Sequence, residues 1–460
     1  MKLNRHISNG FLIMSLLLFP NESFSEQDII TIIHNPVAVA QENEAITFNA
    51  TITSANEILK VSVYYDFTGN RMFDNEIVMG LNGENEFQAI LGPGVFLAFG
   101  MEYYIIAIDV NNNETRTPSD GFYSISANIH DVRSVLPVQG GFSMNDYRLI
   151  SIPLKLPSKE IRSQMSGRLP EGPSGFDWRL FRFNSGSYTL NEYPDIEGFE
   201  PGKSFWLITV NNYSLTCSEG TTVSTAEPFS IELRPGWNYI ANPWMFTISW
   251  NDIANPSAGN LSEIYTYEGL WSDPMNPQQK LEPWQGYVVN NLENRNVIIK
   301  LLPELFSVSK ARSEVDQNEW KLTIKAQTGL AVDSANHLGV AESASKEWDE
   351  NDHLEPPVIG NYISVSFPHQ DWKQYPDDYT VDFRPPDKTI SWDFNIRTNI
   401  PNETVNIDFE NNKSLPEGCS FKVINCDNNH IVDLHNNSFN FVSGNNITER
   451  CFTLIVTTSL

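Results

Sequence analysis

The chain has 460 residues and carries 57 acidic against 30 basic side chains, which gives a formal net charge of −27. This balance excludes an extended basic surface for nucleic acid or for an anionic membrane, because both partners require clustered positive charge. The acidic charge favours solubility and the binding of divalent cations. The length suffices for about three domains, each with a core of its own.

Residues 1–25 have the features of a secretory signal peptide. They begin with basic side chains, continue with an apolar run over 11–19, and end with small residues at Ser23 and Ser25. The apolar run is too short to span a bilayer, and no later run reaches the ~18 residues that a span requires. We therefore expect cleavage after Ser25 and an exported protein without a membrane span, located outside the cell, on its surface or in the periplasm. The alternative is an uncleaved segment that tethers the chain to the membrane.

Residues 28–128 alternate apolar and polar side chains over short runs that are separated by Asn, Gly and Pro. Ile46 and Phe48, for example, face the same way in the first clear run. Alternation of period two with frequent turns predicts an antiparallel sandwich of immunoglobulin-like size. Three stretches resemble the fibronectin type III-like modules of large secreted bacterial proteins: 34–37, 61–65 and 101–109. Such modules imply spacing and presentation rather than a specific ligand.

One pattern of aromatic, Gly and Pro positions occurs twice within residues 147–303. The first copy opens with Tyr147-Arg-Leu-Ile-Ser-Ile-Pro153 and the second with Trp237-Asn-Tyr-Ile-Ala-Asn-Pro243, and the offset changes from 90 residues at the start to 82 at the end. The copies cover about 147–208 and 237–289. We interpret each as a set of short strands and expect the two to pair into one pseudo-symmetric β unit. The preceding residues 129–146 are expected to form a loose connector.

Residues 304–460 are predicted to form a second β-sandwich, with a jelly roll as one candidate topology. Runs rich in β-branched and aromatic residues predict its strands, near 320–326, 362–367, 390–396, 405–409, 421–424 and 452–456. The predicted fold class is therefore all-β, with an immunoglobulin-like sandwich, a duplicated β module and a C-terminal β-sandwich.

The order of these parts resembles modular secreted and cell-surface proteins that Gram-negative bacteria export through the type IX route. Modules of that kind carry the Gly-Trp-Asn…Asn-Pro pattern found at 236–243. They also carry an Asn-x-Leu-Gly-Val…Trp-Asp-x-x-Asp pattern like that at 336–340 and 348–352. The resemblance spans nearly the whole mature chain and implies non-catalytic β modules. Such proteins usually carry a further small sorting domain, whereas this sequence ends at Leu460 directly after a predicted strand, so the resemblance does not extend to surface attachment.

Export permits disulfides, and the mature chain has four cysteines, Cys217, Cys419, Cys426 and Cys451. The strand predicted between Cys419 and Cys426 would hold them about 23 Å apart at ~3.3 Å per residue, too far for a bond. If that strand runs antiparallel to the strand after Cys451, its end meets the start of the other. This arrangement favours a Cys426–Cys451 disulfide, and the alternative is that the thiols are free and buried.

The sequence shows no signature of a catalytic nucleophile, a zinc pair or a phosphate-binding Gly loop. We therefore expect no enzymatic activity. A glycosidase needs only two opposed carboxylates, and a hydrolase with an unrecognised pair of this kind is the third hypothesis for function.

Calcium is the one metal that the sequence suggests, and no other cofactor is expected. Hard cations prefer clustered oxygen ligands on loops. Five such residues fall within twenty positions: Asp333, Asn336, Glu342, Asp349 and Asp352. The alternative is a solvated acidic loop whose backbone is capped by its own side chains.

Seven of the eleven tryptophans fall in the duplicated module, and planar rings on a β surface can stack on sugars. The repeated aromatic positions read as shared core. Trp244 and Trp284 have no aromatic counterpart and sit beside turn prolines, so we expect them to be exposed and able to contact a ligand.

These observations predict a secreted non-catalytic protein for adhesion, scaffolding or ligand presentation. Its partner would be an extracellular or envelope protein, or a polysaccharide. The alternative is a carbohydrate-binding protein that uses Trp244 and Trp284.

Overall fold

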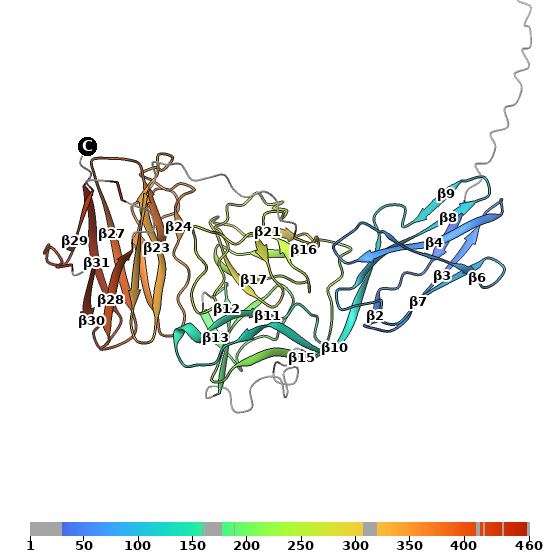
Figure 1. The fold of residues 1–460 in the computed structure, drawn as a ribbon, viewed down its shortest axis with the longest axis horizontal. Coiled ribbons are helices and arrows are strands. Elements are labelled where there is room, and N and C mark those ends of the chain that lie inside the picture. Colours follow the sequence, from blue (N-terminus) through green and yellow to red (C-terminus); the bar gives the residue numbers. More distant parts are fainter. Residues whose placement is uncertain are drawn as a thin grey trace, which may run out of the picture.

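The structure, a computed structural model, describes residues 30–158, 161, 177–187, 189–306, 320–410, 415–416, 419–434 and 437–457. The signal peptide predicted for residues 1–25 lies outside them. The protein is all-β, as predicted, and its β units lie in a row along an elongated molecule (Figure 1). Among the described residues, no helix is long and apolar enough to cross a membrane.

Two sheets form the N-terminal unit. The first has the order β1 (Thr31–His34), β3 (Ile46–Thr53), β7 (Glu86–Leu91), β6 (Gly80–Leu81). The second contains β10 (Tyr123–Val138), β8 (Met101–Asp109), β4 (Ile58–Phe67) and β5 (Asn75–Val78), with β2 (Val39–Gln41) and β9 (Glu114–Thr117) at its side. Period-two alternation buries Phe48 and Ile52 from one sheet against Val61 and Ile105 from the other.

The expectation of a loose connector at 129–146 is wrong for most of that segment. Strand β10 runs from Tyr123 to Val138, pairs with β8 at its start and then pairs with β15 (Tyr213–Thr221). Its second partner lies about 80 residues later in the chain, and local alternation does not reveal such a pairing. A single sheet therefore joins the N-terminal unit to the duplicated module. The 3-10 turn η1 (Met144–Asp146) follows.

The strand registers match the duplication. In copy 1, β11 (Arg148–Ser151) pairs antiparallel with β14 (Ser204–Thr209), which places Ile150 opposite Phe205. In copy 2, β17 (Gly236–Ala241) pairs with β20 (Gly286–Asn291), which places Ile240 opposite Tyr287. The first residues of these pairs are 90 positions apart and the second 82, the offsets seen in the sequence.

The two copies also exchange equivalent contacts. Ile150 bridges to Gln285 and Ile240 bridges to Lys203, positions that correspond between the copies. The Ser151 N–H donates to the Trp284 carbonyl at 2.7 Å, and the Ala241 N–H donates to the Gly202 carbonyl at 3.1 Å. The first strand of each copy thus packs on the turn of the other, which is the pairing expected of a pseudo-two-fold unit.

The repeat is longer than the sequence pattern indicated. Strand β16 (Phe229–Leu233) precedes copy 2 and pairs with β21 (Val297–Leu301), as β10 precedes copy 1 and pairs with β15. The module is completed by β12 (Trp178–Asn184), β13 (Thr189–Glu192), β18 (Ile248–Ser249) and β19 (Lys280–Leu281).

One continuous ten-stranded sheet forms the C-terminal unit. Along its main path the order is β29 (Ser420–Asn425), β31 (Thr448–Thr457), β27 (Thr389–Thr398), β25 (Ile363–Pro368), β26 (Asp378–Arg384), β23 (Val332–Val340), β22 (Trp320–Gln327), β28 (Thr404–Glu410), β30 (Ser438–Val442). Strand β24 (His353–Leu354) pairs with β26. The sheet curls so that Phe439 on its end strand β30 packs across the core on Phe452 of β31, with ring centroids 5.0 Å apart.

A disulfide joins Cys426 to Cys451, with Cα atoms 5.3 Å apart. Strands β29 and β31 are antiparallel, and Asn425 at the end of β29 pairs with Phe452 within β31, which brings Cys426 beside Cys451 as predicted. Cys217 is buried and outside the disulfide, and Cys419 is a free, partly exposed thiol.

The buried core continues across both boundaries between units. One cluster contains Val61 and Tyr103 of the N-terminal unit together with Phe205 of copy 1. A second cluster contains Trp206 and Tyr267 of the duplicated module together with many buried residues of the C-terminal sheet. Each boundary is therefore packed with apolar side chains.

Candidate functional site

The structure buries both tryptophans that we expected to be exposed. Trp244 is 1% exposed and stacks with Phe246, because Asn242 folds the chain into a tight turn by accepting the Trp244 N–H and donating to the Phe246 carbonyl. Trp284 is 3% exposed, since the turn that carries it is covered by the first strand of copy 1. Neither ring can stack on a sugar, so the expectation of exposure is wrong.

Trp284 also has a counterpart in copy 1, although not an aromatic one. It occupies the position equivalent to Gly202, and both residues have a positive φ, 70° and 79° respectively. The turn requires this left-handed conformation, which glycine adopts without cost and tryptophan adopts only under strain. A Cβ at Gly202 would lie 2.6 Å from the ring of Phe229.

The five residues proposed for calcium are divided between two places. Asp333 accepts the Val365 N–H at 2.7 Å, and Asn336 accepts the Thr380 hydroxyl at 2.9 Å, both on β23. Asp349 and Asp352 lie on the following loop, where Asp349 accepts the Asn351 N–H and Asp352 accepts the Asp349 N–H. Glu342 is exposed. In the part of the chain that the structure describes, no three His, Cys, Asp or Glu side chains are grouped to hold a metal ion. The loop residues fit the alternative of a self-capped loop.

Asp333 and a second acid, Glu355, line a crevice of about 30 Å³ beside Tyr267 and Trp271, and both carboxylates are partly buried. Burial raises the pKa of Asp333 to about 6, and burial together with the Asp333 charge raises the pKa of Glu355. The crevice has room for about one water molecule and none for a sugar. This carboxylate pair is therefore part of the packing between the duplicated module and the C-terminal sheet.

These raised pKa values predict a pH dependence. Below its raised pKa each acid keeps a proton that the unfolded chain releases from about pH 4 upward, so the free energy of unfolding falls as pH rises from 5 to 8. The slope is at most about 1.4 kcal/mol per pH unit for each proton. In Glu355→Gln the side-chain carbonyl can still accept the Ser364 hydroxyl, which lies 2.8 Å from the Glu355 Oε1. The variant should therefore show a smaller decrease in the free energy of unfolding between pH 5 and pH 8. Chemical unfolding at pH 5 and pH 8 measures this decrease, and Glu350→Gln, at an exposed position, is the control. Equal slopes in wild type and Glu355→Gln would contradict the assignment.

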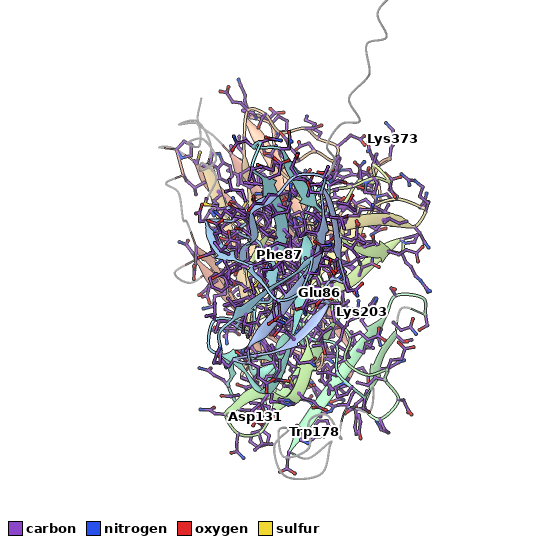
Figure 2. All side chains as sticks on the ribbon, turned by 90° about the vertical axis from the view of Figure 1, so that its right-hand side faces the viewer. Glu86, Phe87, Asp131, Trp178, Lys203 and Lys373 are labelled. Carbon is purple, nitrogen blue, oxygen red and sulfur yellow. A yellow bond between two sulfur atoms is a disulfide. The ribbon has the colours of Figure 1, made fainter. Side chains whose placement is uncertain are left out.

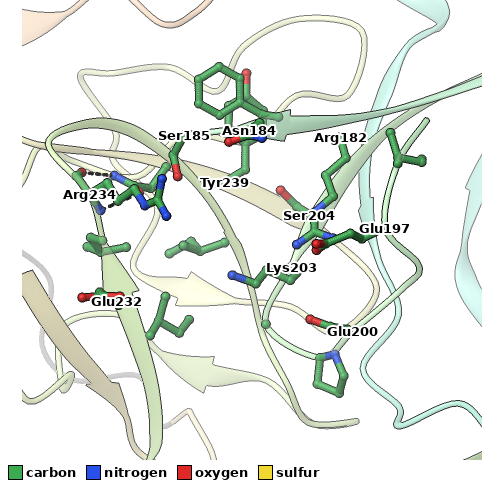
Figure 3. A pocket seen from close by; sticks show the side chains of 18 of the residues that line it. Arg182, Asn184, Ser185, Glu197, Glu200, Lys203, Ser204, Glu232, Arg234 and Tyr239 are labelled. Atoms are coloured by element: carbon green, nitrogen blue, oxygen red, sulfur yellow. Dashed lines mark hydrogen bonds and ion pairs between the residues drawn. The ribbon is translucent and has the colours of Figure 1, made fainter. Parts of the chain in front are cut away.

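A polar groove of about 660 Å³ lies between the two copies (Figure 3). Strand β12 contributes Arg182, Phe183 and Asn184, and the turn before β14 contributes Lys203. The opposite wall comes from copy 2, with Arg234 after β16 and Tyr239 on β17. The groove thus exists only because the copies pair.

Charged side chains of both signs line this groove. The Arg182 Nη1 lies 2.7 Å from the Glu197 Oε2. Figure 3 shows the Lys203 side chain extending into the hollow, with Arg182 and Glu197 on one side and Glu232 and Arg234 on the other. Burial lowers the pKa of Lys203, and Arg182 lowers it further, while Glu200 opposes the shift. Lys203 has no ion pair within 4.0 Å to any described residue.

An aromatic pair forms part of the same wall. Phe183 and Tyr239 are partly exposed and stack with ring centroids 4.6 Å apart, inclined by 28°. The sequence did not predict the groove, because its two walls are about 50 residues apart and the repeated pattern gives no sign that they face each other. The available signal was the difference between the copies at Gly202 and Lys203, which align with Trp284 and Gln285.

Comparison with known proteins gives no relative: the sequence matches no protein-family model and no curated protein.

Proposed function

We propose that the protein is an exported, non-catalytic scaffold that holds its β units at fixed spacing and presents them to an extracellular or envelope partner. The observation that carries this proposal is the apolar core that crosses both boundaries between units. Domains joined by flexible linkers move independently, whereas large apolar contacts oppose such motion. A shared apolar core at each boundary therefore favours one rigid body.

Polar contacts reinforce the boundary with the N-terminal unit. Glu102 is fully buried, accepts the Thr225 hydroxyl at 2.6 Å and lies 3.4 Å from the Arg71 guanidinium. Arg71 also reaches Glu304 at 2.9 Å. Because a buried carboxylate without partners is costly, these contacts favour a single relative orientation of the two units.

The boundary with the C-terminal unit is similarly tied. The Met144 N–H donates to the Leu330 carbonyl at 3.2 Å, and the His337 ring lies 3.3 Å from Asp273. The ring of Tyr147 packs against Gly360, where an added Cβ would be 3.3 Å away. The resemblance of the module order to type IX-exported surface proteins supports the assignment to an exported scaffold.

Distances between spin labels test the rigidity. We would place one label pair at Leu59→Cys and Met275→Cys and another at Met275→Cys and Val442→Cys, all exposed positions, with Cys419→Ser to remove the accessible thiol. Pulsed electron–electron double resonance should give one narrow distance distribution for each pair of labels. A broad or multimodal distribution at either boundary would overturn the scaffold proposal.

A further inference from the structure

We propose that the groove between the copies binds a polysaccharide segment that bears a carboxylate, such as a uronic acid unit, with Lys203 holding the carboxylate. The proposal goes beyond the scaffold function, which does not depend on it, and the two have separate tests. It rests on the size of the groove, the state of Lys203, the aromatic wall and the difference between the copies.

The groove has the dimensions and polarity of a saccharide site. Its volume of about 660 Å³ lies within the range of small-molecule sites, roughly 300–1,000 Å³. Its walls present amide, hydroxyl and charged groups that can bond to sugar hydroxyls. The exposed parts of the stacked Phe183 and Tyr239 rings offer an apolar surface to the C–H face of a sugar ring.

Lys203 lacks the counter-ion that its partly buried position calls for. The neighbouring Glu197 is already held by Arg182 at 2.7 Å, and no described carboxylate lies within 4.0 Å of the Lys203 ammonium. Burying a charge is costly unless it is paired, and a charge-assisted hydrogen bond to a ligand carboxylate would remove that cost. The same ammonium would gain nothing comparable from a neutral sugar.

The second copy shows what this position looks like without a ligand site. Gln285 is the counterpart of Lys203, and it is buried, with its amide donating to Thr266 at 2.9 Å and to Glu268 at 2.8 Å. Its carbonyl accepts the Tyr287 hydroxyl at 3.2 Å. Trp284 buries an indole at the position that Gly202 leaves without a side chain. Copy 2 has therefore satisfied this position internally, and copy 1 has left a cation directed into a hollow.

Titration calorimetry with tetragalacturonic acid, and with its methyl ester as a neutral probe of the same shape, tests the proposal. The acid should bind, and the ester should bind at least tenfold more weakly. Added salt should lower the affinity for the acid. Lys203→Gln should lose at least tenfold in affinity, and Lys203→Arg should stay within about threefold of wild type. Lys373→Gln, at an exposed lysine that Figure 2 shows well apart from Lys203, should change nothing.

Circular dichroism and the unfolding midpoint would establish that each variant is folded. A parallel panel would contain oligomers of mannuronic and glucuronic acid, sialylated oligosaccharides and short peptides with free C-terminal carboxylates. Four results would each overturn the proposal: equal affinity for acid and ester, full affinity in folded Lys203→Gln, binding of the peptides alone, or no binding of any acidic saccharide.

Discussion

Replacing Trp206 with alanine is expected to lower the free energy of unfolding by about 3–5 kcal/mol. The indole of this copy 1 residue is completely buried and packs on two rings of copy 2, with centroids 5.1 Å from Tyr267 and 5.7 Å from Trp271. It belongs to the cluster that continues into the C-terminal sheet, so surrounding side chains cannot collapse into the cavity without shifting a boundary. Urea unfolding, monitored by circular dichroism, measures the change.

The matched control for this variant is Phe142→Ala. Phe142 is 81% exposed, and its removal should change the stability by less than about 0.5 kcal/mol. A loss below about 1 kcal/mol in Trp206→Ala would show that the aromatic cluster is not the centre of the packed core.

Removing the Cys426–Cys451 disulfide by double substitution with serine should cost about 2–4 kcal/mol. The bond closes a loop of 25 residues between two paired strands, and its main effect is to restrict the unfolded chain. The cost should appear as a lower midpoint in chemical unfolding under oxidising conditions. Cys419→Ser is the control, because that thiol is free and partly exposed. If the double variant and the control were equally stable, the bond would contribute nothing to the native fold.

Features that depend on neighbouring residues were predictable from the sequence. Period-two alternation correctly identified β3, in which every second residue is buried, and β4, in which Val61 and Val63 are buried. The duplication predicted two equivalent sets of short strands, and the equivalent pairings of Ile150 with Phe205 and of Ile240 with Tyr287 agree with it. The Cys426–Cys451 bond followed from the antiparallel order of two strong strands.

Features that depend on distant partners were not predictable. The second half of β10 is a strand only because β15 pairs with it. Trp244 and Trp284 looked exposed beside their prolines, yet the folding of a tight turn and the packing of the other copy bury them. The groove around Lys203 needs both copies in place, and a local pattern carries no information about a wall made by another segment.

The central claim, that shared cores make the β units one body, is tested most directly by scanning calorimetry of the mature chain under reversible conditions. The shared clusters predict one cooperative transition whose calorimetric enthalpy equals its van't Hoff enthalpy. Separate transitions for the N-terminal, duplicated and C-terminal units, or a calorimetric enthalpy several times the van't Hoff value, would contradict it.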